Sequence, residues 1–518
     1  MNEKNISVIT RRDFLRRAAC AAVGTAAMTS AIRDLRFMNA AIAGQSIPTD
    51  YKAMVCIFLQ GGNDSNNMII PTVASEYANY AAIRGVNLVL PQNSLLNLQI
   101  PSSLPAPNYN LGTGITPGNT GNYVDPAGHS FGLHPACPEL AQLFYEGKLA
   151  PLFNTGTLIY PITRAQYQNN LNKPPQLFSH ADQQTQWQTS VPDQPPTTGW
   201  GGRCADLLNA ANTSNSISLS VSLAGANIFE IGNAVSQYAV SQYAVSTTGA
   251  IALQGVSGAR LAALTNILGL PYANLQASAY AGVANHSIQT GGVLNSAITN
   301  TAATNYFTNA FPIKIATPNS SSAPFTSSLS AQLRMVARLI EAGNRAAGSP
   351  TNGFGMKRQI FFCQVGGYDL HSGQTSYDGS NPATTIIGAH ANLMAELSQS
   401  LLAFQRAMEQ LGLSQNVTAF TASDFGRTFP TNGQGSDHGW GSHHLILGGA
   451  VKGGKTYGTF PTLTVNGPDD TGIGRWIPTT AIDQYFATLA SWFGVDSGNL
   501  ATVFPNIGRF ATPNLGFI

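Results

Sequence analysis

Charged side chains are scarce in this chain. Of its 518 residues, Lys and Arg account for 26 and Asp and Glu for 24, so charged residues make up 10% and the formal net charge is +2. Nucleic-acid-binding proteins carry a basic patch or stripe, and this composition argues against that class. The polar surface must come from Ser, Thr, Asn and Gln, while 52 Gly and 29 Pro indicate many loops.

Cysteines and long apolar runs are also few. The chain has five Cys, and none of them forms the Cys-x-x-Cys pair of a zinc or redox site. Cys56 and Cys363 lie in strand-like runs and are expected to pack in the core. Cys137 and Cys204 are the other two that follow the N-terminal region, and the sequence does not pair any of the four. Beyond that region no run is long and apolar enough to cross a bilayer, so no stable membrane span is expected.

The N-terminus resembles a twin-arginine export signal. Arg11 and Arg12 stand in the segment Thr-Arg-Arg-Asp-Phe-Leu-Arg, which precedes a weakly apolar, Ala-rich run over 18–32 and a small-residue cleavage site ending at Ala43. We predict that residues 1–43 are a signal peptide read by the twin-arginine export machinery, and that the mature protein is periplasmic or secreted. The alternative is an ordinary helix with a basic end.

Apolar runs and helical patterns alternate in a way typical of α/β proteins. Buried strands are predicted at 53–60, 149–154, 359–365 and 417–421, with a further strand-like run at 444–449. Helices are predicted at 137–146, 329–347, 387–410 and 482–493. The order of these elements predicts a doubly wound, mostly parallel sheet with helices on both faces.

The middle of the chain has a different composition. Residues 209–324 are rich in Ala, Ser, Thr and Asn and contain a short tandem repeat, 234–238 followed by 239–243. We interpret this region as an insertion or cap that interrupts one α/β domain. The first part of that domain would span 44–208 and the second part 325–518.

Three of the predicted strands end in a polar motif with a carboxylate: Asp64, Asp369 and Asp424. Open parallel sheets bind ligands outside the carboxyl ends of their strands, so these residues are expected to converge. A single Asp in such a position is usually a turn or cap residue. Here His371 stands two residues after Asp369, and His438 follows Asp437 in a nearby loop. The combination of carboxylates and imidazoles indicates a metal site.

Short motifs along the mature chain resemble the exported DUF1501 proteins. They are 61–67 (GGNDSNN), 134–135 (HP), 178–180 (FSH), 366–371 (GGYDLH), 425–428 (FGRT), 437–440 (DHGW) and 448–454 (GGAVKGG). That family is placed among the distant relatives of the alkaline phosphatase and sulfatase superfamily. The resemblance therefore implies an alkaline phosphatase-like fold, interrupted by the middle insertion.

The resemblance also implies a role for each matching residue. The implied metal ligands are Asp64, Asp369, His371, Asp424 and His438. Ser179, at the start of a predicted helix, matches the nucleophile, and both a helix N-terminus and a nearby cation would favour its ionised form. The alternative for Ser179 is a helix N-cap.

Three further residues are candidates to bind an anionic ester. Arg427 and Arg203 could hold its oxygens by forked hydrogen bonds, and Asn67 belongs to the first motif. Each arginine could instead be structural.

The chain departs from the superfamily pattern in two places. The pair Asp369 and His371 is more closely spaced than in many phosphatases, and Phe425 follows Asp424 where a histidine ligand is often found. One of two metal positions is therefore expected to be weak, differently built or empty, with His443 and His444 as substitute ligands. A Cys-x-Pro-x-Arg-like sulfatase segment is absent, and so is the Gly-x-Ser-x-Gly elbow of serine esterases.

These features favour an exported metal-dependent hydrolase that acts on a small-molecule or polymeric phosphate or sulfate ester, with Ser179 as nucleophile. Mixed carboxylate and imidazole ligands are compatible with zinc, manganese, magnesium or calcium. One alternative is a non-catalytic exported surface or partner-binding protein on the same scaffold, with at most a structural metal. Another is a transferase that adds phosphate-containing groups to an envelope glycan.

Overall fold

The computed structural model describes residues 44–99, 121–212, 217–235, 237–240, 258–299, 311–312, 314–316, 323–347 and 353–518. The predicted signal peptide, 1–43, lies outside these residues, and so does part of the tandem repeat. Residues Ile47–Ile518 form one unit, and the description below concerns that unit.

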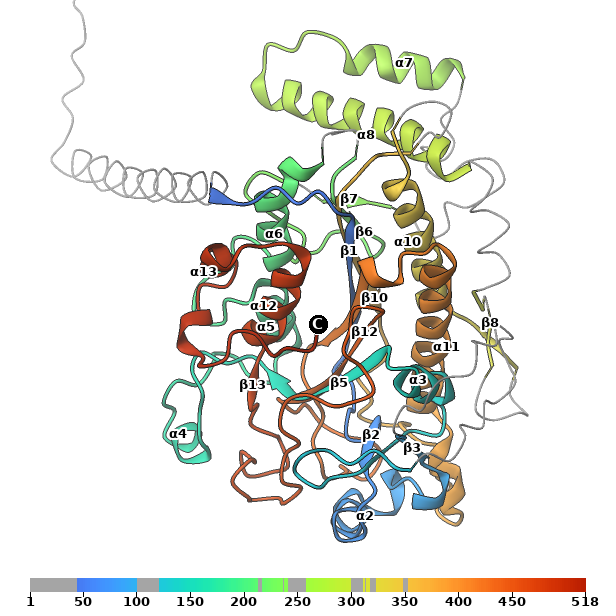
Figure 1. Cartoon of the computed structure of the whole chain (residues 1–518), viewed down its shortest axis with the longest axis vertical. Helices are drawn as coiled ribbons and strands as arrows, with labels where there is room; N and C mark the ends of the chain where they lie inside the picture. Colours follow the sequence, from blue (N-terminus) through green and yellow to red (C-terminus); the bar gives the residue numbers. More distant parts are fainter. Residues whose placement is uncertain are drawn as a thin grey trace, which may run out of the picture. The chain divides into compact units, whose positions relative to one another are not determined.

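An eight-stranded sheet runs through the unit (Figure 1). In spatial order its strands are β13 (Thr480–Ala481), β5 (Leu149–Gly156), β12 (Ser442–Gly448), β11 (Val417–Ser423), β1 (Lys52–Leu59), β10 (Arg358–Val365), β6 (Ser220–Ser222) and β7 (Tyr238–Ala239). Strand β12 is antiparallel to both of its neighbours, whereas all the other pairs are parallel. The predicted mostly parallel sheet is confirmed, with one reversed strand.

The central strand β1 explains why the sequence shows continuous apolar runs. It pairs with β10 on one side and β11 on the other, so that Val55 lies between Phe361 and Ala419. All its residues after Lys52 are buried, because helices cover both faces of a parallel sheet and leave no polar side. The four described cysteines are free and buried, and Cys56 and Cys363 lie in the neighbouring strands β1 and β10, as expected of core residues.

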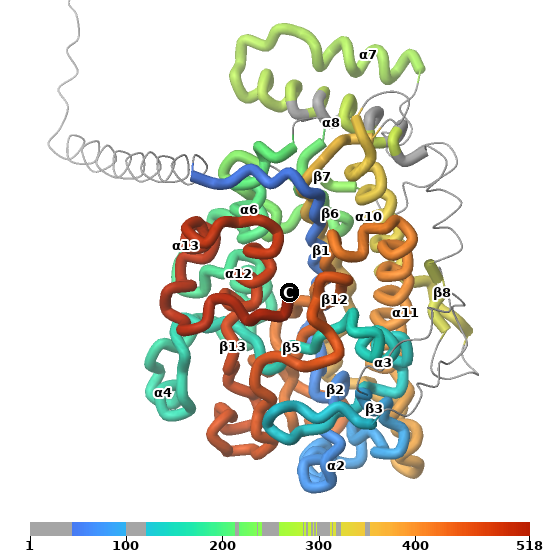
Figure 2. The backbone as a smooth tube through the Cα atoms, in the orientation of Figure 1, coloured from blue at the N-terminus to red at the C-terminus, as the bar shows by residue number. Residues whose placement is uncertain are grey.

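Helices cover both faces of the sheet (Figures 1 and 2). One layer contains α3 (Pro138–Tyr145), α10 (Ser328–Asn344) and α11 (Ala389–Gln410). The other contains α5 (His180–Thr189), α6 (Trp200–Leu208) and α12 (Ile482–Phe493). The apolar face of α10, including Leu329, Leu333 and Ile340, is buried. The hydroxyl of Ser327 caps this helix by accepting from the Ser330 amide at 2.8 Å.

Part of the region 209–324 belongs to the main sheet. Strands β6 and β7 continue the sheet beyond β10, so the stretch that contains them is an edge of the core sheet. Helices α7 (Ala259–Leu268) and α8 (Leu275–Thr299) contact each other, and α8 also contacts α10. The described part of this region therefore combines two edge strands with a pair of helices.

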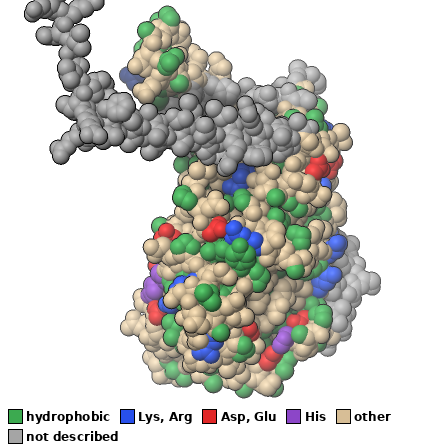
Figure 3. Space-filling model, turned by 90° about the vertical axis from the view of Figure 1, so that its left-hand side faces the viewer, with side chains coloured by type: hydrophobic (Ala, Val, Ile, Leu, Met, Phe, Trp, Pro, Cys, Tyr) green, Lys and Arg blue, Asp and Glu red, His purple; other side chains and the backbone are tan. Residues whose placement is uncertain are grey.

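Smaller elements complete the unit. They are β2 (Ile69–Pro71), α2 (Ala74–Leu88), β3 (Leu96–Asn97), β4 (Phe131–Leu133), α4 (Arg164–Gln168), β8 (Lys314–Ile315), β9 (Phe325–Thr326) and α13 (Leu500–Val503). On the face shown in Figure 3, charged side chains are scattered among uncharged ones, as the composition predicts. None of the helices in the described part of the chain is long and apolar enough to cross a membrane.

Two glycines after β1 allow three loops to meet at the carboxyl edge of the sheet. Gly61 has φ +113°, and a Cβ added there would lie 2.4 Å from the backbone nitrogen of Asp369, in the loop after β10. Gly62 has φ +84°, and a Cβ there would lie 2.6 Å from the ring of Phe425, in the loop after β11. Only glycine accepts both this conformation and this close approach.

We predict that Gly61→Ala destabilises the protein more than Gly128→Ala does, by about 1–3 kcal/mol in the free energy of unfolding. Gly128 has a similar φ of +94° but open space around it, so its substitution costs only the conformational strain. Urea unfolding of both variants measures the difference. Equal losses would show that the contact between the two loops adds no constraint.

Candidate metal centre

Three histidines and one aspartate converge at the carboxyl edge of the sheet. The Nε2 atom of His438 lies 3.1 Å from Nε2 of His180 and 2.9 Å from Nε2 of His371. The carboxylate of Asp369 lies 3.4 Å from His180, 3.4 Å from His438 and 3.1 Å from His371. We refer to these four residues as the His–Asp cluster. The ligand atoms of His180, Asp369 and His438 all lie within 4.8 Å of one another.

Each imidazole of the cluster has an acceptor at its other nitrogen. The Nδ1 atom lies 2.6 Å from Asp424 Oδ2 in His180, 3.0 Å from Asp437 Oδ1 in His371, and 2.7 Å from the Phe178 carbonyl oxygen in His438. A neutral imidazole carries one N–H, and these acceptors hold it at Nδ1. The Nε2 lone pairs of His180 and His371 therefore both face that of His438, an arrangement that a bound cation would stabilise. Such outer hydrogen bonds are typical of metal-binding histidines.

The pKa values of two cluster residues suit metal binding. Burial lowers the pKa of His438, although the Phe178 carbonyl opposes this shift. Burial raises the pKa of Asp369, but the hydrogen bond and charge of Arg427 outweigh it and leave the net pKa below its usual value. At neutral pH His438 is thus neutral and Asp369 is ionised, as metal ligands must be. His180, Asp369 and His438 lie close enough together to hold one divalent cation.

Arg427 fixes Asp369 and the loops around it. Its buried guanidinium donates to the carbonyl oxygens of Gly62 at 2.9 Å, Ser436 at 3.0 Å and Tyr368 at 3.1 Å, and it also contacts Gly61 and the Asp369 carboxylate. Because these acceptors belong to the protein, the position of Arg427 does not support the predicted contact with a substrate. Arg427 is a positioning residue for Asp369.

Asp64 does not join the cluster. Its Oδ2 atom pairs with Arg84 and accepts a hydrogen bond from Gln374, and the side chain is buried. Burial raises the pKa of Asp64, yet the Arg84 charge and these hydrogen bonds leave it below the usual value. Arg84 also donates to the carbonyls of Thr428 and Phe429. The resemblance implied a metal at Asp64, but the structure supplies a buried guanidinium there instead.

Asp424 orients a histidine of the cluster, and both of its own oxygens already have partners. This buried residue accepts from the Gly61 amide at 3.2 Å through Oδ1. Its Oδ2 atom accepts from Gln184 at 2.8 Å and faces His180 Nδ1. The predicted metal ligand therefore acts behind His180, orienting its ring.

Ser179 adjoins the cluster as the N-cap residue of α5, immediately before His180. Its hydroxyl donates to Asp182 Oδ2 at 2.6 Å and caps no backbone amide. The preceding residue, Phe178, has φ +73°, a conformation that is costly for an aromatic residue. Since the carbonyl of Phe178 accepts from His438, this strained backbone connects α5 to the cluster.

The other predicted site residues lie elsewhere. Arg203 is buried in α6 and donates to the carbonyls of Thr189, Thr198 and Val503. Asn67 is buried and bonds the Leu88 carbonyl and the Tyr80 hydroxyl. Their contacts are structural and give no support to substrate binding.

His443 and His444, considered as substitute ligands, are buried in β12. Burial lowers the pKa of each to about 3. His443 accepts from the Asn154 amide through Nδ1 at 3.1 Å, and His444 packs against Trp187. Both are neutral core residues.

Two residues at the site were not singled out as candidates from the sequence. His180 appears in the sequence only as part of the Phe-Ser-His motif, whose place at a helix start could have indicated a ligand. Arg475, whose Nε donates to the His438 carbonyl at 2.7 Å, lies in a segment without a motif. Only the folded chain brings it to the cluster.

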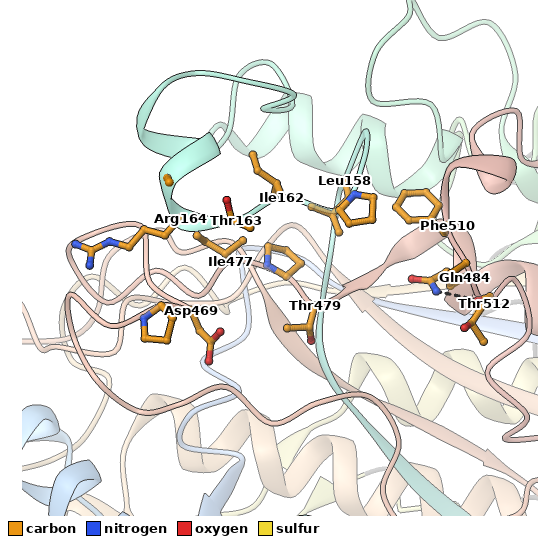
Figure 4. Close-up of a pocket in the computed structure, with 15 residues that line it drawn as sticks. Leu158, Ile162, Thr163, Arg164, Asp469, Ile477, Thr479, Gln484, Phe510 and Thr512 are labelled. Carbon is orange, nitrogen blue, oxygen red and sulfur yellow. Dashed lines mark hydrogen bonds between the residues drawn. The ribbon is translucent and has the colours of Figure 1, made fainter.

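A separate cavity of about 580 Å³ lies between α4 and the segments around Ile477 and Phe510 (Figure 4). Its walls include Leu158 and Ile162, and no residue of the His–Asp cluster lines it. Polar groups at its rim bond within the protein: Arg164 contacts Asn466, and Gln484 donates to the Thr512 carbonyl at 2.8 Å. The cavity shows no chemistry comparable to that of the cluster.

We predict that Asp424→Asn lowers metal affinity about 10- to 100-fold, because an amide does not hold the His180 ring as a carboxylate does. Asp378→Asn is the control for the same chemical change, since Asp378 lies in an exposed loop and accepts hydrogen bonds from Ser380 and Asn381. Competition with a chromophoric chelator measures the affinity for zinc and manganese. Unchanged affinity in Asp424→Asn would contradict the assigned orienting role.

The Asp64–Arg84 pair gives a second prediction. At neutral pH, Arg84→Met should lower the free energy of unfolding by about 3–5 kcal/mol, because it leaves a buried carboxylate without a partner. The folded-state pKa of Asp64 is depressed, so the stabilisation is present above about pH 4 and is lost as the pH falls through that depressed value. Urea unfolding from pH 7 downward should therefore show the deficit shrinking. The double variant Arg84→Met/Asp64→Asn should lose less than Arg84→Met alone, and an equal loss would contradict the charge argument.

Comparisons with known proteins give a family and several distant structural neighbours, two of which are described here. Two solved structures each align with 73% of this chain and over 72% of their own chain, at 10% sequence identity. They are "Crystal structure of Ps i-CgsB in complex with k-i-k-neocarrahexaose" and "Crystal structure of Ps i-CgsB". Their TM-scores of 0.30 and 0.28 are too low to support any conclusion. No curated protein matches the chain.

The family model is more informative because it spans most of the chain. The model described as "Protein of unknown function (DUF1501)" matches residues 51–473, a range that contains every residue of the His–Asp cluster. This protein belongs to the DUF1501 family.

Proposed function

We propose that this protein is an exported metal-dependent hydrolase of phosphate or sulfate esters. The observation that carries the proposal is the convergence of three Nε2 lone pairs and the Asp369 carboxylate at the carboxyl edge of the sheet. A divalent cation bound there would supply Lewis-acid chemistry, polarising an ester oxygen and favouring ionisation of a nearby hydroxyl. Imidazole donors favour zinc over manganese, magnesium and calcium, which suit oxygen ligands.

The exposure of the cluster supports a catalytic site. The side chains of Asp369 and His371 are each 45% exposed, whereas Asp424 behind them is buried. Catalytic metal sites keep a position open to solvent, while structural sites are closed by protein ligands. A substrate can therefore approach from the side of Asp369 and His371.

Ser179 is the proposed nucleophile. Its hydroxyl already donates to Asp182 Oδ2 at 2.6 Å, and this carboxylate would take the proton as the serine oxygen bonds to phosphorus or sulfur and the ester oxygen leaves with the electron pair. The N-terminus of α5 would stabilise negative charge on the oxygen. Water would then cleave the seryl ester, releasing phosphate or sulfate and restoring the hydroxyl.

Two parts of the proposal, export and the detailed arrangement of the sheet, depend on the sequence. Export is supported by the twin-arginine motif in residues 1–43, which lie outside the described part of the chain. We also infer an alkaline phosphatase-like arrangement of the sheet, supported by the polar motifs that follow β1, β10 and β11 at one edge. The ester itself could be a small molecule or a polymer.

One observation favours the alternative, a non-catalytic exported surface or partner-binding protein with a structural metal. Helices α7 and α8 expose apolar side chains, with Leu275 87% and Tyr280 75% exposed, and such side chains suit a partner interface. Metal without ester turnover would support this alternative.

We predict that Asp369→Ala removes both bound metal and turnover of p-nitrophenyl phosphate or sulfate, whereas Ser179→Ala keeps the metal and loses turnover. Asp182→Asn should keep the metal and lower turnover about 10²- to 10⁴-fold, because it removes the proton acceptor. Elemental analysis and a chromogenic ester panel measure both properties, with Asp378→Ala as the control in the same loop as Asp369. Unchanged turnover in Ser179→Ala would remove this nucleophile, and a metal-free wild-type protein would end the proposal.

A further inference from the structure

Arg475 is held against the cluster by two contacts. Its Nε donates to the carbonyl oxygen of His438 at 2.7 Å. Its guanidinium carbon lies 3.9 Å from the centroid of the Phe178 ring, and the carbonyl of Phe178 accepts from the same histidine. Arg475 is thus fixed beside a cluster residue by stacking and by one hydrogen bond.

The remaining donors of Arg475 are not used by the protein. Its two Nη groups form no hydrogen bond or ion pair with any residue that the structure describes, and the side chain is only half-buried. Arg427 differs, since it donates to several backbone carbonyls and to Asp369. Arg84 and Arg203 are likewise committed to protein acceptors. Among these four arginines, Arg475 is the one with an unused fork.

The carboxylates around Arg475 have other hydrogen-bond partners. Asp437 and Asp470 both interact electrostatically with Arg475. Oδ1 of Asp437 is held by His371 Nδ1 at 3.0 Å and by Asn432 Nδ2 at 2.9 Å. Asp470 accepts from the backbone amides of Asn466, Gly474 and Arg475, each at 2.8 Å. Asp369 is already paired with Arg427. A divalent cation in the cluster would add positive charge beside Arg475 and so favour an anionic group there.

We propose that Arg475 forms an anion-binding subsite that takes two oxygens of a phosphate or sulfate group through its Nη fork. The inference rests on the proposed function and gives the ester a contact that Arg427 and Arg203, with their protein partners, do not provide. A guanidinium fork matches two oxygens of a tetrahedral oxyanion. Arg475 then determines specificity for anionic over neutral esters.

The experiment titrates inorganic phosphate and, separately, inorganic sulfate into the purified protein by calorimetry. Arg475→Gln should weaken binding of the preferred ion about 10- to 100-fold, the loss expected for a charged hydrogen-bonded contact. Arg475→Lys should recover part of it, because it keeps the charge but lacks the fork. Arg164→Gln is the control, since Arg164 lines the separate cavity and bonds Asn466. Metal content and thermal unfolding, measured for each variant, show whether His438 stays in place.

The possible outcomes test the anion-binding subsite separately from the proposed hydrolase activity. Equal affinity in wild type and in Arg475→Gln overturns the subsite, and so does a wild type that binds neither ion. If Arg475→Gln loses its metal, the test uses Arg475→Lys with its metal retained. An affinity for phosphate or sulfate equal to that of the wild type then overturns the subsite. An effect of Arg475 on phosphate or sulfate binding in a protein without ester turnover keeps the subsite and rejects the hydrolase. Ester turnover without any effect of Arg475 on phosphate or sulfate binding keeps the hydrolase and rejects the subsite.

Discussion

The site depends on one buried guanidinium. Arg427 bonds the loops that follow β1, β10 and β11 through their carbonyls and holds the carboxylate of Asp369. A buried arginine is costly unless acceptors surround it, so its presence requires the three loops to approach closely. Gly61 and Gly62 make that approach sterically feasible. Without this centre the strand ends would still align, but Asp369 would have no fixed direction.

Orientation of the imidazoles comes from elsewhere in the chain. The acceptors for the three Nδ1 atoms are the carboxylates of Asp424 and Asp437 and the carbonyl of Phe178. One directly follows a strand, one lies in the loop before β12, and one precedes α5. Since each acceptor fixes one tautomer, the cluster has a defined set of donors before any ligand binds. The strained backbone of Phe178 is part of this preorganisation.

The sequence predicted where the site lies in the fold better than it predicted the role of each residue there. Buried strands were readable because apolar runs end in polar motifs, and Asp369, His371 and His438 do converge. The reversal of β12 was not readable, since strand direction follows from packing and not from composition. Asp64 and Asp424 were predicted as ligands because their positions after strands are alike. Their roles differ through partners such as Arg84 and His180, which are distant in sequence, and no local pattern reports such pairings.

Charge compensation distinguishes the proposed cation site from Asp64. Asp64 has Arg84 and Asp369 has Arg427, so both carboxylates carry a permanent counter-charge. Asp424 is as buried as Asp64, but its partners among the described residues are the Gly61 amide, Gln184 and His180, and no arginine is among them. A buried carboxylate without an arginine is best stabilised when its histidine carries positive charge or binds a cation. Binding at the cluster would therefore stabilise the fold through His180 and Asp424, linking metal loading to the stability of the sheet edge.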